Sequence, residues 1–150
     1  MNWDEYFIEM LEPISKKSKD PRTKVACIFV GKNNEILITG FNGFPIGVKD
    51  LPERYNDRNI KYKFVSHAER NAIAFAARNG VALDGSKIYL GWYPCSECTK
   101  SIIQAGVKEC VIDGRKYSEA IKHWESWKED IDISKTMLDE AGINIRIYGK

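Results

Sequence analysis

Hydrophobic residues near the start of the chain follow the period of an α-helix. Six of them recur every three or four residues and predict a helix over residues 3–14: Trp3, Tyr6, Phe7, Met10, Leu11 and Ile14. Asn2 and Glu5 form the side-chain pair typical of a helix N-terminus. Two apolar runs over residues 25–31 and 36–40 are separated by a short polar stretch, which predicts a β-hairpin.

The rest of the chain alternates between strand and helix patterns after one long interruption. Residues 41–64 show no sustained period and predict an irregular excursion, of a length that usually carries function. The elements predicted beyond it are a helix over 67–79, a strand over 87–91, a helix over 94–105, a strand over 108–113, helices over 117–127 and 133–141, and a strand over 143–148. Strands separated by helices require right-handed crossovers and a sheet covered on both faces.

Composition narrows the class of protein. The 150 residues suit a single domain over residues 1–150, and 43% hydrophobic residues, with 4 Trp, 7 Tyr and 6 Phe, are enough for a substantial core. This excludes a disordered chain and a disulfide scaffold. A net charge of +2 provides no global field for nucleic acid. No apolar run reaches the length of a membrane span, and the acidic start of the chain disfavours a signal peptide, so we expect a cytoplasmic protein.

The four cysteines fall into two pairs. Cys27 and Cys110 lie among strand-forming residues and are interpreted as small buried hydrophobes. Cys95 and Cys98 form a C-x-x-C at the start of a predicted helix, where unpaired backbone N–H groups stabilise thiolates.

A second fragment, His67-Ala68-Glu69, also lies at the start of a predicted helix. One histidine and two cysteines are a donor set that suits zinc, and three protein ligands leave a coordination position open, as catalytic zinc sites do. Bound zinc lowers the pKa of its water to about 7. Each fragment has a plainer interpretation: His67 as a helix-end residue, Glu69 as a first-turn acid, and the C-x-x-C as a redox pair. The redox interpretation leaves His67 without a role.

H-x-E together with P-C-x-x-C is the signature of zinc-dependent nucleobase deaminases. The sequence resembles the cytidine deaminase-like superfamily, and within it the deoxycytidylate (dCMP) deaminases. The likeness covers most of the chain, and its most diagnostic segments are Asn-Gly-Phe-Pro at 42–45 and Ile-Ile-Gln-Ala-Gly at 102–106. The resemblance implies a three-layer α/β/α fold with a central mixed five-stranded sheet. It implies hydrolysis of dCMP to dUMP and ammonia, which supplies dUMP for dTMP synthesis.

The resemblance also implies roles for individual residues. His67, Cys95 and Cys98 would bind one Zn²⁺ per subunit, and Glu69 would carry protons between water and the base. The residues implied in substrate binding are Ser18, Lys19, Lys24, Asn42 and Tyr117. The cations among them belong to a basic segment that could equally be a solvated surface.

Many dCMP deaminases are hexamers that dCTP activates and dTTP inhibits, with Mg²⁺ bound to the effectors. By resemblance, the candidate effector residues are Gly43, Phe44, Phe75 and Arg78. Phe75 is equally suited to the core, and Arg78 to a solvated helix end.

Departures from the family pattern leave alternatives open. Ala26-Cys27 stands where relatives usually have Gly-Ala. Trp92-Tyr93 precedes Pro94, at the expected mouth of the pocket, so a 5-substituted dCMP is an alternative substrate. A deaminase of tRNA or other nucleic-acid bases shares the zinc motif, although the weak net charge disfavours it. A catalytically idle zinc or effector-binding module is a third alternative, which the intact Glu69 disfavours.

Overall fold

The computed structural model describes residues 1–117 and 125–149. Its elements in chain order are α1 (Trp3–Ser15), β1 (Ala26–Val30), β2 (Ile36–Phe41), α2 (Pro52–Asn56), α3 (Arg58–Phe64), α4 (Ala68–Asn79), β3 (Lys87–Leu90), α5 (Ser96–Gln104), β4 (Glu109–Asp113), α7 (Ser126–Glu140) and β5 (Asn144–Tyr148). None of the described helices is long and apolar enough to cross a membrane.

The five strands form one mixed sheet in the order β2-β1-β3-β4-β5. β1 pairs antiparallel with both of its neighbours, whereas β3, β4 and β5 run parallel. Helices cover both faces of this sheet, and all five residues of β1 are buried. The predicted three-layer α/β/α fold with a mixed five-stranded sheet is confirmed.

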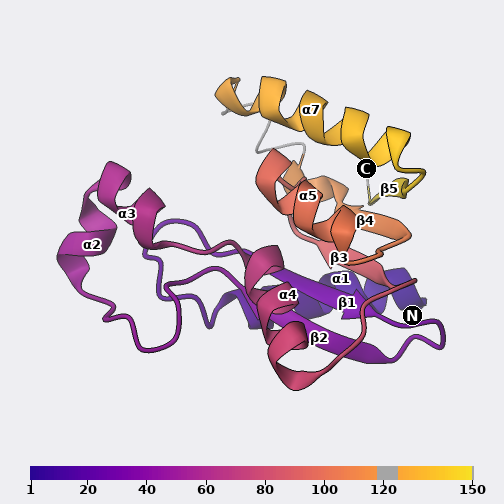
Figure 1. Ribbon diagram of the computed structural model, residues 1–150, viewed down its shortest axis with the longest axis horizontal. Coiled ribbons are helices and arrows are strands. Elements are labelled where there is room, and N and C mark those ends of the chain that lie inside the picture. The colour runs from indigo at the N-terminus through magenta and orange to yellow at the C-terminus, as the bar shows by residue number, and fades with distance from the viewer. Residues whose placement is uncertain (118–124, 150) are drawn as a thin grey trace.

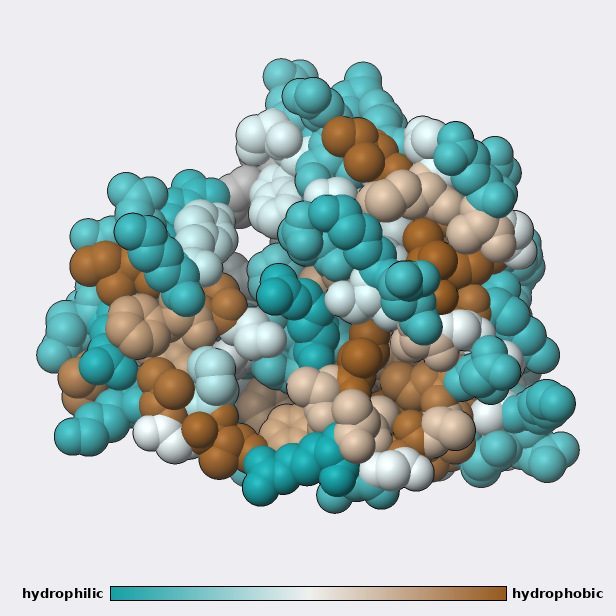
Figure 2. Space-filling model, in the orientation of Figure 1, coloured by the Kyte–Doolittle hydropathy of each residue, from teal (hydrophilic) through white to brown (hydrophobic). Residues whose placement is uncertain are grey.

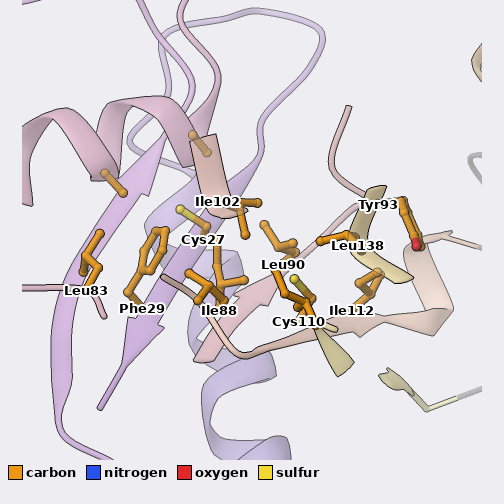
Figure 3. Close-up of a cluster of buried hydrophobic side chains, with 14 of the residues drawn as sticks. Cys27, Phe29, Leu83, Ile88, Leu90, Tyr93, Ile102, Cys110, Ile112 and Leu138 are labelled. Carbon is orange, nitrogen blue, oxygen red and sulfur yellow. The ribbon is translucent and has the colours of Figure 1, made fainter. Parts of the chain in front are cut away.

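Alternate strand residues divide the core between the two faces. On one face, Ile28, Tyr89 and Val111 pack against α1 through Phe7 and Leu11. The other face carries the larger cluster, drawn in Figure 3, which packs beneath the helices of that side: Cys27, Phe29, Ile88, Leu90, Ile102, Cys110, Ile112 and Leu138.

Cys27 and Cys110 are fully buried in this cluster, as the sequence predicts. Burial raises the pKa of the Cys110 thiol to about 12, so this thiol stays protonated.

Two predicted segments differ from the structure. The excursion over residues 41–64 contains two short helices, α2 and α3, which we call the α2–α3 lobe (residues 52–64). In Figure 1 the lobe stands away from the sheet, and in Figure 2 a hollow separates it from the body of the molecule. Periodicity could not predict these helices because each has at most two turns, and α3 buries no residue.

The other difference concerns the C-terminal helix, which begins at Ser126 and not at residue 133. One side of this helix packs into the core through Trp127, Ile131 and Leu138. The helix predicted over 117–127 lies mostly outside the described residues.

The register of the sheet brings two helix starts to one edge. Ala26 pairs with Phe41 at the end of β2, and the adjacent Cys27 pairs with Leu90 at the end of β3. The chain leaves β2 at this edge toward the lobe and α4, and it leaves β3 at the same edge toward α5. Gly40 allows α4 to lie directly on β2, since a Cβ there would come within 2.4 Å of the Ala68 carbonyl oxygen.

Candidate active site

Both predicted chemical fragments lie at this edge. His67 is the N-cap residue of α4 and Cys95 is the N-cap residue of α5, and both have an extended backbone. Cys98 is buried in the first turn of α5. Asn71 fixes the approach to His67, because its Nδ2 donates to the carbonyls of Phe41 (2.9 Å) and Ser66 (3.2 Å). Two helix N-termini therefore deliver the histidine and the cysteines to one place.

The three donor atoms fit a tetrahedral metal. His67 Nδ1 lies 3.4 Å from Cys95 Sγ and 3.4 Å from Cys98 Sγ. Zinc–nitrogen and zinc–sulfur bonds at a tetrahedral angle place N and S about 3.5 Å apart. Among the described residues, His67, Cys95 and Cys98 form the group of three possible metal ligands. Their donor atoms all lie within 4.8 Å of one another. The donor set therefore suits Zn²⁺ with one coordination position left for another molecule.

The surroundings stabilise a thiolate on Cys95. Hydrogen bonding from Cys98 lowers the pKa of the Cys95 thiol to about 4, and His67 adds to this effect. The hydrogen bond with Cys95 in turn raises the pKa of His67. A thiolate is the form in which cysteine binds metals.

Glu69 lies in the first turn of α4, two residues after His67, and its side chain is buried with only 8% of the residue exposed. Burial raises the pKa of its carboxyl because the charged form loses solvation. Glu69, His67 and Cys95 line the same pocket. A carboxyl whose pKa is raised by burial is better suited to general acid–base chemistry than an exposed one.

The pocket encloses about 160 Å³ between α3, the ends of β1 and β3, and α7. Its walls are largely apolar and include five aromatic side chains from four segments: Tyr62, Trp92, Tyr93, Tyr117 and Trp127. The Tyr93 hydroxyl is buried and has no hydrogen-bond partner in the described part of the chain. Such walls suit a planar ring, and the few polar groups would then orient it.

The residues predicted to bind substrate are only partly brought together. Asn42 and Tyr117 line the pocket. The Asn42 amide is held by the backbone, because its Oδ1 accepts from Val25 N and its Nδ2 donates to Thr23 O, both at 2.9 Å. Ser18 lies behind Asn42, since its buried hydroxyl donates to the Asn42 carbonyl at 2.8 Å.

The two predicted lysines lie elsewhere. Lys19 Nζ pairs with Asp50 Oδ2 at 3.1 Å on the surface. Lys24 Nζ donates to the Ser18 carbonyl. Neither lines the pocket.

Sequence reasoning missed an ion pair in the pocket wall. Lys61 of α3 and Asp20 both line the pocket, and Lys61 Nζ lies 3.0 Å from Asp20 Oδ2. Lys61 lies in the stretch that lacks any period. The sequence signal that could have revealed this helix is Asp57, a residue typical of a helix N-terminus. It caps α3 by accepting from Asn59 N and Ile60 N, and Lys61 follows one turn later.

The candidate effector residues lie at two different ends of α4. Gly43 pairs with Ser66, just before His67, and the Phe44 ring stacks on Tyr55 of the lobe at 4.3 Å. Phe75 and Arg78 lie toward the C-terminal end of α4, where Phe75 is half-buried and Arg78 is exposed.

One carboxylate of α7 fixes the start of α5. Asp130 Oδ2 accepts from Ser96 N at 2.9 Å, and Asp130 Oδ1 accepts from Ser96 Oγ at 2.6 Å. Ser96 follows Cys95 directly, so these bonds hold the turn that carries both cysteines. α7 therefore supports the metal donors from outside their own helix.

We expect Asp130→Ala to weaken zinc binding, on the order of 10-fold, because the turn that orients Cys95 and Cys98 loses both anchors. Competition with a chelator of known affinity measures the change. Asp132→Ala on the exposed side of α7 is the matched control. Equal zinc affinity in the two variants would show that the turn needs no support from α7.

Comparison with known proteins agrees with this geometry. Residues 1–113 match the family model described as cytidine and deoxycytidylate deaminase zinc-binding region. The deoxycytidylate deaminase of Homo sapiens is 34% identical over 153 residues, covering 99% of this chain and 80% of that protein. A deaminase from the luxG 3′ region of Aliivibrio fischeri is 36% identical over 143 residues, covering 95% and 91%.

The fold is shared with the dCMP deaminase of the cyanophage S-TIM5. Its structure in apo form has a TM-score of 0.72 at 28% identity, covering 96% of this chain and 95% of that one. Its structure in complex with dCMP and dUMP has a TM-score of 0.71 at 30% identity, covering 95% and 94%. The chain therefore belongs to the cytidine and deoxycytidylate deaminase family.

Proposed function

We propose that the protein catalyses the hydrolytic deamination of dCMP to dUMP with release of ammonia. The observation that carries the proposal is the meeting of the donor atoms of His67, Cys95 and Cys98 beside a pocket that His67, Cys95 and the buried Glu69 line. The similarity to a dCMP deaminase crystallised with dCMP and dUMP, over nearly the whole of both chains, supports this choice of substrate.

We propose that His67, Cys95 and Cys98 hold one Zn²⁺ per subunit. When bound, the ion supplies Lewis acidity that makes a water nucleophilic near neutral pH. The donor distances and the lowered pKa of Cys95 support this assignment.

Glu69 carries the protons of the reaction. Its carboxylate accepts a proton from the attacking water and delivers it to N3 of the cytosine ring as C4 is attacked. It then assists the transfer of a proton to the amino group, which leaves as ammonia. A group that acts as base and then as acid needs a pKa near the working pH, and the burial of Glu69 shifts its pKa in that direction.

The pocket walls bind the rest of the nucleotide. We assign the aromatic walls to the base, and Asn42 and Tyr117 to the sugar and its substituents. Ser18 acts through Asn42, whose carbonyl it holds. Lys19 and Lys24 contribute positive charge outside the pocket, which attracts an anionic substrate at longer range. Trp92 and Tyr93 set the tolerance for substituents on the base.

The proposal predicts that dCMP is converted with a much higher kcat/KM than cytidine, and that cytosine and a tRNA anticodon stem-loop are not converted. Loss of ultraviolet absorbance and release of ammonia, with the four substrates and 5-methyl-dCMP in parallel, measure this. Glu69→Gln is expected to retain zinc and to lose about 10²- to 10⁴-fold in kcat, because the proton carrier is gone.

Three outcomes would contradict the proposal. Conversion of the stem-loop and not of dCMP would assign the protein to nucleic-acid deaminases. A strong preference for 5-methyl-dCMP would make the modified nucleotide the substrate. Near-normal turnover by Glu69→Gln would remove Glu69 from the mechanism.

We further propose that the enzyme is a cytoplasmic homo-hexamer, activated by dCTP and inhibited by dTTP with Mg²⁺. The proposed effector residues are Gly43, Phe44, Phe75 and Arg78. Support comes from the bridge between Gly43 and Ser66, the residue before His67, and from the stacking of Phe44 on Tyr55 of the lobe that walls the pocket. A ligand at Gly43 and Phe44 would act on the pocket through these contacts.

This regulation predicts a sigmoidal dependence of rate on dCMP that becomes hyperbolic with dCTP and shifts to higher dCMP with dTTP. Phe44→Ala should weaken both effects, because the contact with the lobe is lost. Sedimentation of the same samples measures the oligomer. Hyperbolic kinetics unaffected by either triphosphate would contradict the regulatory proposal.

A further inference from the structure

We propose that Lys61 is the cation that recognises the 5′-phosphate of the substrate, and that Asp20 positions it. This inference rests on the proposed function and names the residue that distinguishes a nucleotide from a nucleoside. Lys61 is the basic residue that lines the pocket within the described ranges, 1–117 and 125–149. It shares that pocket with His67 and Glu69, the residues assigned to the reaction.

The ammonium of Lys61 is withdrawn from water and held in place. Only 12% of its side chain is exposed, and 1% of that of Asp20. Asp20 is itself fixed, because its Oδ1 accepts from Arg22 N (2.9 Å) and Thr23 N (3.1 Å). Its Oδ2 is the atom that lies 3.0 Å from Lys61 Nζ. The carboxylate thus anchors the ammonium from one side.

The ammonium has donors to spare. Lysine carries three N–H donors, and a single carboxylate oxygen on one side leaves the others free to face the pocket. Oxygen atoms of a phosphate are strong acceptors for such charge-assisted bonds. Among largely apolar walls, where the effective dielectric constant is low, this attraction is stronger than at the surface.

The rival cations are occupied outside the pocket. Lys19 pairs with Asp50, and Lys24 donates to the Ser18 carbonyl. Together with Arg22 they keep the segment around Asp20 positively charged, which offsets the repulsion between the Asp20 carboxylate and a phosphate. The surface cations therefore attract the anion, while Lys61 contacts it.

The position of Lys61 on α3 also gives the lobe a function. Lys61 N donates to Asp57 O at 2.8 Å, and Val65 N donates to Lys61 O at 2.9 Å, so its backbone is fixed within the short helix. Removal of the charge should therefore affect phosphate recognition more than the shape of the pocket.

The test compares kcat/KM for dCMP with kcat/KM for deoxycytidine in the same zinc-loaded preparation. The ratio does not depend on the fraction of folded enzyme, so it remains valid if a variant is less stable. Lys61→Met should lower the ratio about 10- to 100-fold, chiefly through KM for dCMP. Lys61→Arg should restore part of it. Lys63→Met, an exposed lysine of the same helix, is the matched control and should keep the wild-type ratio.

Binding of dUMP and deoxyuridine, measured by calorimetry, separates this inference from the proposed function. If the wild type converts dCMP and Lys61→Met keeps the wild-type ratio, Lys61 does not recognise the phosphate. A larger fall for Lys19→Met or Lys24→Met would also overturn the inference. If the wild type binds dUMP through Lys61 but does not convert dCMP, the proposed function fails and this inference stands.

Discussion

The site depends on one constraint, the common edge at which β2 and β3 end. Both strands run antiparallel to β1, and their last residues, Phe41 and Leu90, pair with neighbouring residues of β1. The chain leaves both strands at this edge and, after the lobe, returns to it where Ser66 pairs with Gly43. A histidine before α4 and a C-x-x-C at the start of α5 therefore meet within hydrogen-bonding distance. The missing side chain of Gly40 lets α4 lie close enough for this to happen.

Polar contacts from distant segments then close the pocket around the donors. The Ser18 hydroxyl holds Asn42, Asp130 of α7 holds the turn after Cys95, and Asp20 pairs with Lys61 of the lobe. The Ser18 and Asp20 contacts are buried and the Asp130 contact is part-buried, so removal of one partner costs more free energy than at a fully exposed contact. The lobe and α7 therefore complete a site whose reactive atoms come from the sheet edge.

The chemistry was more predictable from the sequence than the surroundings of the site. Strands, helix starts and the His67/Cys95/Cys98 set follow from short-range patterns: buried strands are apolar runs, and metal donors sit at fixed spacings. Lys61 could not be found in this way, because α3 is short, buries no residue and has no apolar period. Lys19 and Lys24 were favoured because they are basic and close in sequence, but only the fold shows that their side chains are engaged outside the pocket.

In the proposed site, two thiolates and one imidazole hold a catalytic zinc. X-ray absorption at the zinc edge of the purified, zinc-loaded protein tests it most directly. We expect two sulfur neighbours at about 2.3 Å and two lighter neighbours at about 2.0–2.1 Å, one of them His67 and the other exchangeable. Replacement of Cys98 by serine should remove one sulfur neighbour. Four sulfur neighbours, or a spectrum unchanged by that substitution, would rule out this zinc site.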